Sequence, residues 1–320
     1  MVNEKTQSID SIINILKNAD KPVSGEELAE NLGVSRVAVW KTVNRLKQDG
    51  YNIESSRSGY WLKALTDKPL PRELNRHDES IRYFDELDST MKKARLLLEN
   101  GCSDGTTIIA GMQTAGISRE GGRWNSPSGG LYFTRIRTRP LPLLSAGIYC
   151  TALTATVAET IRNLFDIPAQ VRWPNEVTIE GRKLSGLLTS FSGELFTVSG
   201  ISTGIGVNVN ISAEALPENA VSIMQLTGRA VSIKDLLSCL LETIQETDSL
   251  FSTTDSEIME QITNKCRKNM ETLGRDVIIK HDGIEKIGKA VDLDSTGALL
   301  IKTGRENLIS IYRGEDYSYV

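Results

Sequence analysis

The first 62 residues place apolar side chains at the spacing of short helices. Ile12, Ile13 and Leu16 share one helical face, and Ser24 begins a second helix with the Ser-x-x-Glu pattern of a helix cap. Gly33 marks a turn, and the helix after it carries apolar residues at Val37, Val39, Trp40, Val43 and Leu46. Two short helices joined by a turn that contains glycine are typical of a helix-turn-helix.

Two strand-like segments follow these helices. Residues 51–54 and 59–62 contain aromatic and aliphatic side chains and are separated by a turn of serines and one arginine. A hairpin after a helix-turn-helix predicts a winged helix over residues 1–64. Residues 65–81 are mainly polar and contain Pro69 and Pro71, which predicts a linker.

The remainder of the chain alternates between strand and helix patterns and then changes to strands alone. Strands are expected over residues 106–112, 170–173, 183–192 and 195–210, and helices over 144–165, 233–250 and 256–270. From residue 272 to 320 only short strands with Gly or Asp turns remain, which predicts a small β-barrel. The expected fold class is therefore α+β, with a large domain over residues 82–271 between the winged helix and the barrel.

Charge is distributed unevenly along the chain. The 37 Lys and Arg residues against 41 Asp and Glu residues give a net charge of −4, which argues against a protein held on nucleic acid by charge alone. Residues 35–63, however, contain six basic and only two acidic residues. This local excess of positive charge coincides with the predicted winged helix and favours a DNA-reading module. A winged helix used for protein contacts is the alternative.

The DNA-facing residues follow from the expected position of the third helix. The start and the outer face of that helix meet base edges in helix-turn-helix proteins, and the wing tip meets phosphate or the minor groove. The candidate DNA-binding residues are Ser35, Arg36, Lys41, Arg45 and Arg57. One such module neutralises few phosphates, so we expect specific binding to require a dimer on two half-sites.

Several classes of protein are disfavoured by what the sequence lacks. The four cysteines are far apart without CxxC spacing, and His77 and His281 are the only histidines. A disulfide framework, a zinc cluster and a Cys-His hydrolase are therefore not expected. No apolar run approaches the length of a membrane span, and the first residues do not resemble a signal peptide. The expected location is the cytoplasm, with no membrane partner.

Residues 111–130 form the first candidate for a chemical site. This segment, GMQTAGISREGGRWNSPSGG, contains six glycines, Arg119, Arg123 and Trp124, and it follows an apolar strand. Glycines let the backbone approach a ligand closely, and the two arginines suit anions. The segment matches neither the P-loop nor the dinucleotide fingerprint. A long surface loop without a ligand is the alternative.

Lys183 and the glycines near residue 204 form the second candidate. Lys183 lies just inside an apolar strand beside glycine, so it is either a residue at the edge of the sheet or a fixed positive charge in a cleft. Gly204 and Gly206 leave room on their strand for another backbone or a ligand.

The order of these motifs resembles a known family. After the winged helix come Asp88-Ser89-Thr90, Gln113-Thr114-Ala115-Gly116, Arg172-Trp173-Pro174-Asn175, Gly181-Arg182-Lys183-Leu184-Ser185-Gly186 and Gly204-Ile205-Gly206-Val207-Asn208. The chain resembles, over essentially its whole length, the bifunctional biotin protein ligases that also act as repressors of the biotin operon. The resemblance rests on several motifs in the correct order and not on any single one.

The resemblance implies both a fold and a reaction. The fold would contain a central mixed sheet with helices, like that of class II synthetases, and a C-terminal SH3-like barrel. Biotin and MgATP would give biotinyl-5′-AMP and pyrophosphate, and biotin would pass to a lysine of a biotin carboxyl carrier domain of a biotin-dependent carboxylase. The loaded enzyme would form a homodimer by pairing sheet edges and would then bind operator DNA. Leu195–Ile211 supplies a suitable apolar strand for this pairing, and the alternative is that this strand is internal to the sheet.

The resemblance also implies roles for individual residues. Biotin would be bound by Ser89, Thr90, Gln113, Gly116, Arg119, Lys183, Gly186, Leu188 and Gly204. ATP would be bound by Arg119, Arg123, Trp124, Asn175 and Asn208. Lys183 and Arg119 would offset negative charge in the first step, and Glu176 would accept the proton of the acceptor lysine in the second. Asn175, Glu176 and Asn208 would face the nucleotide side and its Mg²⁺, and no residue is assigned as a metal ligand.

The sequence departs from the family pattern at five positions. Where the family has Lys-Trp-Pro-Asn-Asp, Arg172 and Glu176 stand in place of the lysine and the aspartate. The family loop usually reads Gly-Arg-Gly-Arg-x-Gly-Arg, and Ile117 and Gly122 occupy two of its arginine positions here. Met91 replaces the asparagine that often follows Ser-Thr. Loss of cationic partners weakens binding of an acyl phosphate. Two alternatives therefore stand beside the ligase–repressor: a biotin-sensing repressor with weak or no ligase activity, and a ligase for a related carboxylic acid.

Overall fold

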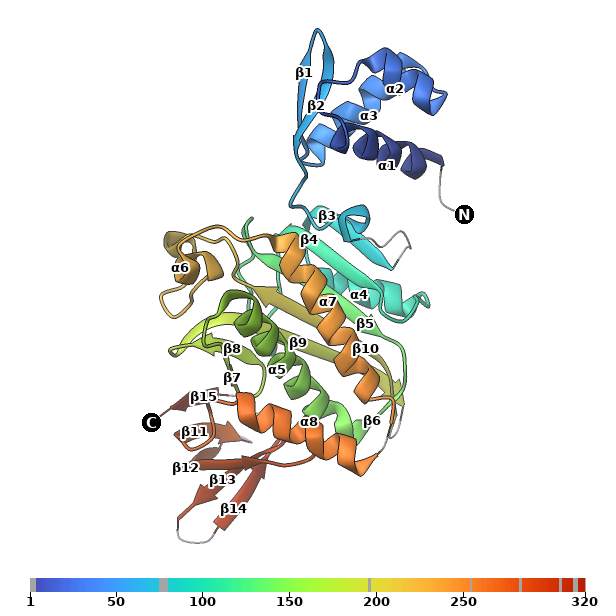
Figure 1. Ribbon diagram of the computed structural model, residues 1–320. Coiled ribbons are helices and arrows are strands. Elements are labelled where there is room, and N and C mark those ends of the chain that lie inside the picture. Colours follow the sequence, from blue (N-terminus) through green and yellow to red (C-terminus); the bar gives the residue numbers. More distant parts are fainter. Residues whose placement is uncertain are drawn as a thin grey trace. The chain divides into compact units, whose positions relative to one another are not determined.

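The computed structural model describes residues 4–74, 80–194, 197–253, 255–281, 284–304, 307–312 and 316–319. The chain consists of two compact units, Met1–Asp78 and Glu79–Val320 (Figure 1).

The N-terminal unit has the expected order of three helices and a hairpin. It contains α1 (Glu4–Lys17), α2 (Gly25–Leu32), α3 (Arg36–Gln48), β1 (Asn52–Ser56) and β2 (Gly59–Ala64). Ser24 and Ser35 cap α2 and α3 by accepting hydrogen bonds from the backbone N–H groups of Glu27 and Ala38. Gly33 ends α2 in the left-handed conformation, which glycine adopts without steric cost. These caps produce the short turn of a helix-turn-helix.

The five apolar residues of α3 divide between two environments. Val39, Val43 and Leu46 are buried. Val37 and Trp40, by contrast, are 62% and 55% exposed. A single helix cannot turn both faces toward the same core, so these two residues lie outside it.

The segment predicted as a linker packs, in part, against the winged helix. Leu70 and Leu74 are buried. The Arg72 guanidinium forms an ion pair with Asp49 and donates a 2.9 Å hydrogen bond to the Tyr51 hydroxyl. Residues 66–74 thus belong to the packed N-terminal unit and are not an extended spacer, while residues 75–79 lie outside the described residues.

A mixed sheet forms the centre of the second unit. Its strands, in spatial order, are β3 (Ile81–Leu87), β4 (Thr107–Gln113), β5 (Leu131–Arg137), β10 (Thr197–Val207), β9 (Arg182–Glu194), β8 (Glu176–Ile179) and β7 (Gln170–Arg172), and β6 (Leu141–Pro142) also pairs with β10. Only β3 and β4 run parallel to each other; the other neighbours are antiparallel.

Helices cover both faces of this sheet. The helix α4 (Thr90–Glu99) lies on one face, where Ala94 packs with Ile108 and Ile136. The opposite face is covered by α5 (Ala146–Phe165), α7 (Ile233–Leu250) and α8 (Ser256–Asn269), with α6 (Ile223–Thr227) in the loop before α7. All seven residues of β5 are buried, as expected for a strand covered on both faces.

The helix α5 also has the composition of a membrane span. The segment Leu143–Phe165 is long and apolar enough to cross a membrane, although no such run was expected from the sequence. In the fold it lies between the sheet and α7 and α8, and 67% of its most apolar window is buried. Burial inside the protein accounts for its composition.

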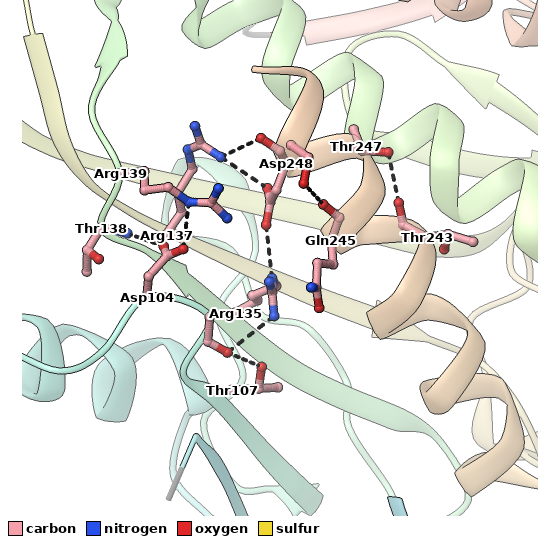
Figure 2. Close-up of polar contacts among 12 residues, drawn as sticks. Asp104, Thr107, Arg135, Arg137, Thr138, Arg139, Thr243, Gln245, Thr247 and Asp248 are labelled. Atoms are coloured by element: carbon pink, nitrogen blue, oxygen red, sulfur yellow. Dashed lines mark hydrogen bonds and ion pairs between the residues drawn. The ribbon is translucent and has the colours of Figure 1, made fainter. Parts of the chain in front are cut away.

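A buried charge cluster joins α7 to the sheet on the α5 face (Figure 2). Arg135 of β5 forms a 3.1 Å ion pair with Asp248 at the end of α7, and Arg137 donates a 2.7 Å hydrogen bond to the Asp248 carbonyl. Tyr149 of α5 donates its hydroxyl proton to the same carboxylate at 2.7 Å. Burial, and next the negative charge of Asp248, raise the pKa of Tyr149 well above its ordinary value, so that it remains a donor.

The C-terminal residues form a five-stranded antiparallel sheet, as the short strand patterns predict. Its strands are β11 (Asp276–His281), β12 (Ile284–Leu293), β13 (Leu299–Thr303), β14 (Asn307–Ile311) and β15 (Asp316–Tyr319), in the spatial order β14-β13-β12-β11-β15. The Trp173 indole N–H donates to the Gly297 carbonyl at 3.1 Å. Arg267 at the end of α8 forms an ion pair with Asp292. These contacts fix the small sheet to the large domain.

The strand β10, expected to supply a free edge, lies inside the sheet. It pairs with β5 and β6 on one side and with β9 on the other. The expectation that this strand pairs between subunits is therefore wrong for its described residues, 197–207. The ladder between β8 and β9 ends at Gly186, so from Leu188 to Glu194 the side of β9 that faces away from β10 is paired with no described strand.

Candidate active site

A cavity of about 400 Å³ lies on the α4 face of the sheet. Its walls come from the start of α4, the glycine-rich loop, the Trp-Pro-Asn turn and strands β8 to β10. The lining residues are Ser89, Thr90, Met91, Gln113, Ile117, Ser118, Arg119, Trp124, Arg172, Trp173, Pro174, Asn175, Glu176, Lys183, Gly186, Leu187, Leu188, Gly204, Ile205, Gly206 and Asn219. Segments separated by more than 100 residues in sequence thus meet at one site.

Glycines form the floor of the cavity. Gly186 of β9 pairs with Gly206 of β10, and Leu188 pairs with Gly204. A Cβ atom on Gly206 would lie 2.5 Å from the Trp124 indole nitrogen, and one on Gly186 would lie 2.8 Å from the same ring. Bare backbone is required here because the indole rests directly on it.

A bulge in β9 brings Lys183 to the cavity. The register pairs Val177 with Ser185 but Thr178 with Lys183, so Leu184 is an extra residue. In a regular strand Lys183 and Gly186 would face opposite sides of the sheet. The bulge places them on the same side, since a Cβ atom on Gly186 would lie 3.3 Å from the Lys183 side chain.

The Lys183 ammonium lies between an acid and a ring. It donates to the Glu176 carboxylate at 2.5 Å and lies 5.2 Å from the centre of the Trp124 ring. Both charged side chains are about 70% shielded from solvent. A partly shielded cation of this kind can exchange its carboxylate partner for an anion of the ligand. It is therefore suited to binding a carboxylate or a phosphate.

A polar network borders the cavity at the start of α4. Gln113 accepts hydrogen bonds from the backbone N–H and the hydroxyl of Thr90, at 2.8 and 3.1 Å, and donates to the Ser126 hydroxyl at 2.9 Å. Thr134 donates to the Thr90 hydroxyl at 2.8 Å. The Ser89 hydroxyl is fully buried, lines the cavity and has no hydrogen-bond partner among the described residues. An unpaired buried hydroxyl at a cavity wall suits a polar ligand group.

The glycine-rich loop is held to the sheet by several contacts. Arg119 donates to the Asn175 side-chain oxygen at 3.2 Å, and Asn175 in turn donates to the Leu187 carbonyl. The backbone N–H of Trp124 donates to the Gly116 carbonyl at 3.0 Å. Arg123 is exposed and donates to the Thr114 carbonyl at 2.9 Å. Of the two loop arginines, only Arg119 lines the cavity.

Most of the residues selected from the sequence meet at this cavity. Those that line it are Ser89, Thr90, Gln113, Arg119, Trp124, Asn175, Glu176, Lys183, Gly186, Leu188 and Gly204. Gly116, Arg123 and Asn208 do not. Gly116 has no room for a side chain beside the Trp124 carbonyl, and the buried Asn208 amide donates to the Val221 and Lys183 carbonyls. Asn208 therefore supports the strand that carries Lys183.

Sequence reasoning missed some lining residues. Gly206, which the strand pattern names with Gly204 as leaving room for a ligand, lines the cavity although it is absent from the residues assigned to biotin or ATP. Arg172 also lines the cavity but is engaged by Glu271, with which it forms a 3.1 Å ion pair. Asn219 lines it because the Lys183 backbone N–H donates to the Asn219 carbonyl at 2.8 Å. No sequence pattern pointed to Asn219.

Within the described part of the chain, no three His, Cys, Asp or Glu side chains come together as a metal site. Glu176 and the Asn175 amide are the oxygen ligands closest to Arg119 and Lys183, and both already have partners. A divalent cation held here would therefore be bound mainly by a phosphorylated ligand.

The winged helix carries the five residues selected for DNA binding. Arg36, Lys41, Arg45 and Arg57 are exposed, and Ser35 uses its hydroxyl to cap α3. The helix α3 contains no acidic residue. Its exposed surface is therefore positively charged.

Comparisons with known proteins agree with both parts of the chain. Residues 9–61 match the family model described as an HTH domain, and residues 83–208 match the Biotin/lipoate A/B protein ligase family. The chain is 29% identical over 309 residues to the bifunctional ligase/repressor BirA of Bacillus subtilis (strain 168), covering 92% of this chain and 93% of that protein. It is 27% identical over 307 residues to the protein of the same name from Escherichia coli (strain K12), covering 92% of each.

A solved structure also resembles this chain. The biotin protein ligase from Aquifex aeolicus in complex with biotin and ATP superimposes with a TM-score of 0.64 and 29% sequence identity, covering 75% of this chain and 99% of that one. Together these comparisons confirm the resemblance that the order of the motifs indicated.

Proposed function

We infer the activity from the premise that this chain belongs to the family of bifunctional biotin protein ligases that are also DNA-binding repressors. It makes biotinyl-5′-AMP from biotin and MgATP and transfers biotin to a lysine of a biotin carboxyl carrier domain. The observation that carries this assignment is one cavity that combines an unpaired buried hydroxyl, Ser89, with the cations of Arg119 and Lys183 above a glycine floor.

In the first step, an oxygen of the biotin carboxylate attacks the α-phosphorus of ATP, and the bond from that phosphorus to the pyrophosphate oxygen breaks. The carboxylate is already ionised near neutral pH, so no base is needed. The step requires two anions to meet in line. We propose that Arg119 and Lys183 offset their repulsion and the charge that develops on the phosphoryl oxygens.

In the second step, the amine of the acceptor lysine attacks the acyl carbon and AMP leaves. The attacking nitrogen must lose a proton, and Glu176 is the carboxylate at the cavity that we propose to accept it. Trp124, resting on the glycine floor, would restrict the access of water to the adenylate.

Mg²⁺ is proposed to enter as part of MgATP. The protein offers it little besides Glu176 and Asn175, whose side chains are engaged by Lys183 and Arg119. Phosphate oxygens and water would then complete its coordination.

We propose that the winged helix binds operator DNA when the ligand-loaded chain forms a homodimer. The edge of β9 from Leu188 to Glu194 replaces β10 as the proposed pairing strand, because β10 is paired on both sides. The cavity is lined both by Ile117 and Arg119 of the loop and by Leu188 of this edge. A bound adenylate could therefore favour the dimer by binding more tightly to the dimer than to the monomer.

Other assignments complete the proposal. The domains would be a winged helix over residues 1–64, a connecting segment over 65–81 whose residues 66–74 pack against the winged helix, a catalytic domain over 82–271 that is related to class II synthetases, and a terminal domain over 272–320. The five-stranded C-terminal sheet is proposed to curve into an SH3-like barrel. We propose a cytoplasmic location, where biotin-dependent carboxylases would be its substrates.

Replacing Ser89 with alanine is expected to weaken biotin binding about 10-fold without destabilising the fold, because a hydrogen bond to the ligand is lost. Isothermal titration with biotin and a urea melt measure the two effects. Ser185→Ala is a matched control, since the Ser185 hydroxyl is also fully buried and unpaired but does not line the cavity. Equal biotin affinities for Ser89→Ala and the wild type would show that Ser89 does not contact biotin.

The assignment is tested by incubating the chain with biotin, MgATP and a biotin carboxyl carrier domain. We expect biotinyl-AMP by mass spectrometry and biotin on the carrier lysine. Adenylate without carrier labelling, together with biotin-dependent DNA binding, would instead support a biotin-sensing repressor. A thermal shift with lipoate but not biotin would support a ligase for another acid. Absence of any adenylate would contradict the ligase assignment.

A further inference from the structure

Two exposed apolar side chains lie on α3, the second helix of the helix-turn-helix. Val37 is 62% exposed and Trp40 is 55% exposed. They are three residues apart, so they lie side by side on one helical face. Lys41 and Asn44 are one turn further along the same face and border the pair. An exposed tryptophan beside an exposed valine is costly in water and points to a surface that becomes covered.

Charge indicates what covers this surface. The helix contains four basic residues and no acidic residue, and its N-terminal turn contains Arg36. Arg36, Lys41 and Arg45 are exposed around the apolar pair. On α3 itself the apolar pair has positively charged neighbours and no negatively charged ones, which suits a polyanion that also presents apolar groups. A protein partner would need a strongly acidic rim to match it.

DNA presents such apolar groups in its major groove. The 5-methyl group of thymine is the apolar group on a base edge, and contact with it distinguishes A·T pairs from the other pairs. The N-terminal half of the second helix is the part that meets base edges in a helix-turn-helix, and Val37 and Trp40 lie in that half of α3. Their aliphatic and aromatic surfaces are suited to cover these methyl groups.

We propose that Val37 and Trp40 read thymine methyl groups in the major groove of the operator, and so determine part of its sequence. This inference rests on the proposed DNA binding and adds residues that give it specificity. Arg36 and Arg45 would contact phosphates at the sides of the groove and contribute affinity without sequence preference. Val37 and Trp40 would contribute discrimination between DNA sequences, and their contacts would add little to the salt dependence of the affinity.

The test uses the full chain loaded with biotin and MgATP. A pool of random-sequence DNA duplexes is selected for binding, and the bound sequence is determined. Each thymine of the selected site is then replaced, one at a time, by deoxyuridine, which pairs identically but lacks the methyl group. Dissociation constants are measured at one salt concentration for the wild type, Trp40→Ala, Val37→Ala and Arg57→Ala.

We expect at least one deoxyuridine substitution in each half-site to weaken wild-type binding about 5-fold or more. The same deoxyuridine replacement should not weaken DNA binding by the variant that lacks the residue covering that methyl group. That variant is either Trp40→Ala or Val37→Ala. Arg57→Ala, at the wing tip, is the control: it should weaken binding to every duplex while retaining the deoxyuridine effect.

Two results would overturn the inference. Wild-type binding that tolerates deoxyuridine at every thymine would show that no methyl group is read, a result that requires no variant to fold. A deoxyuridine effect that persists in both Trp40→Ala and Val37→Ala would assign the reading to other residues. If the wild type labels a carrier domain but selects no duplex, the proposed DNA binding itself is wrong, which distinguishes the two failures.

Discussion

Replacing Lys183 with methionine is expected to slow the formation of biotinyl-AMP by about 10²- to 10³-fold, the usual cost of removing one preorganised donor from a developing anion. Methionine retains the length of the side chain and its contact with Trp124 but removes the charge. The loss should appear in kcat for pyrophosphate release more than in KM for biotin, because the charge on the phosphoryl oxygens grows in the transition state.

Lys265→Met is the matched control for this substitution. Lys265 forms a 2.8 Å ion pair with Glu159 that is open to solvent and outside the cavity, so its loss should change adenylate formation less than about twofold. Equal rates of adenylate formation for Lys183→Met and Lys265→Met would show that Lys183 takes no part in this step. Glu176→Gln separates the two steps, since it should spare adenylate formation and slow transfer to the carrier lysine.

Replacing Asp248 with alanine is expected to destabilise the unit Glu79–Val320 by about 3–5 kcal/mol, because it leaves buried positive charge without a partner. Asp248 is 2% exposed and faces Arg135, 8% exposed, and Arg137, 2% exposed. The Tyr149 hydroxyl would also lose its acceptor. Such a loss lowers the melting temperature by about 6–20 °C for a unit of this size.

Glu99→Ala provides the comparison for this stability measurement. Glu99 pairs with Arg95 on the outer surface of α4, where both side chains are more than half exposed, so its loss should cost less than about 1 kcal/mol. A calorimetric melt measures both variants. An Asp248→Ala protein that melts within a degree of the wild type would show that the arginines find other acceptors. Asp248→Asn, which keeps the hydrogen-bond acceptor, should lose less stability than Asp248→Ala.

The N-terminal unit was predictable because its signals are local. Ser24, Gly33 and Ser35 determine where α2 and α3 begin and end, and the hydrogen bonds of those caps are present. The exposure of Val37 and Trp40 was not predictable from helical spacing, since spacing gives a face and not its environment. Only the position of α3 relative to the other helices decides which face is covered.

The central domain was harder to predict because its strands are covered on both faces. Leu131–Arg137 is buried throughout, and two of its buried residues are arginines that require Asp248, more than 100 residues later. No local pattern reports such a partner, and the strand was missed. The helix α4 was missed as well, although Ser89 and Thr90 at its start were selected as site residues from the motif alone.

The site residues were found by motif, whereas their arrangement was not. Alternation along β9 would have put Lys183 and Gly186 on opposite faces, and only the register shift at Leu184 corrects this. The same holds for β10, whose apolar sequence fits a free edge as well as an interior position. Pairing with β5 makes β10 an interior strand, and β5 is distant from β10 in sequence.

The extra residue in β9 has a consequence for how this site can be lost or gained. If Leu184 were instead paired as a regular strand residue, the three-residue spacing would turn the Lys183 ammonium to the face opposite the cavity, although every side chain named in the reaction would still be present. Two related chains with identical motif residues could therefore differ in activity through the presence or absence of this bulge. For this architecture, the backbone pairing between Glu176 and Gly186 carries functional information that residue identity does not.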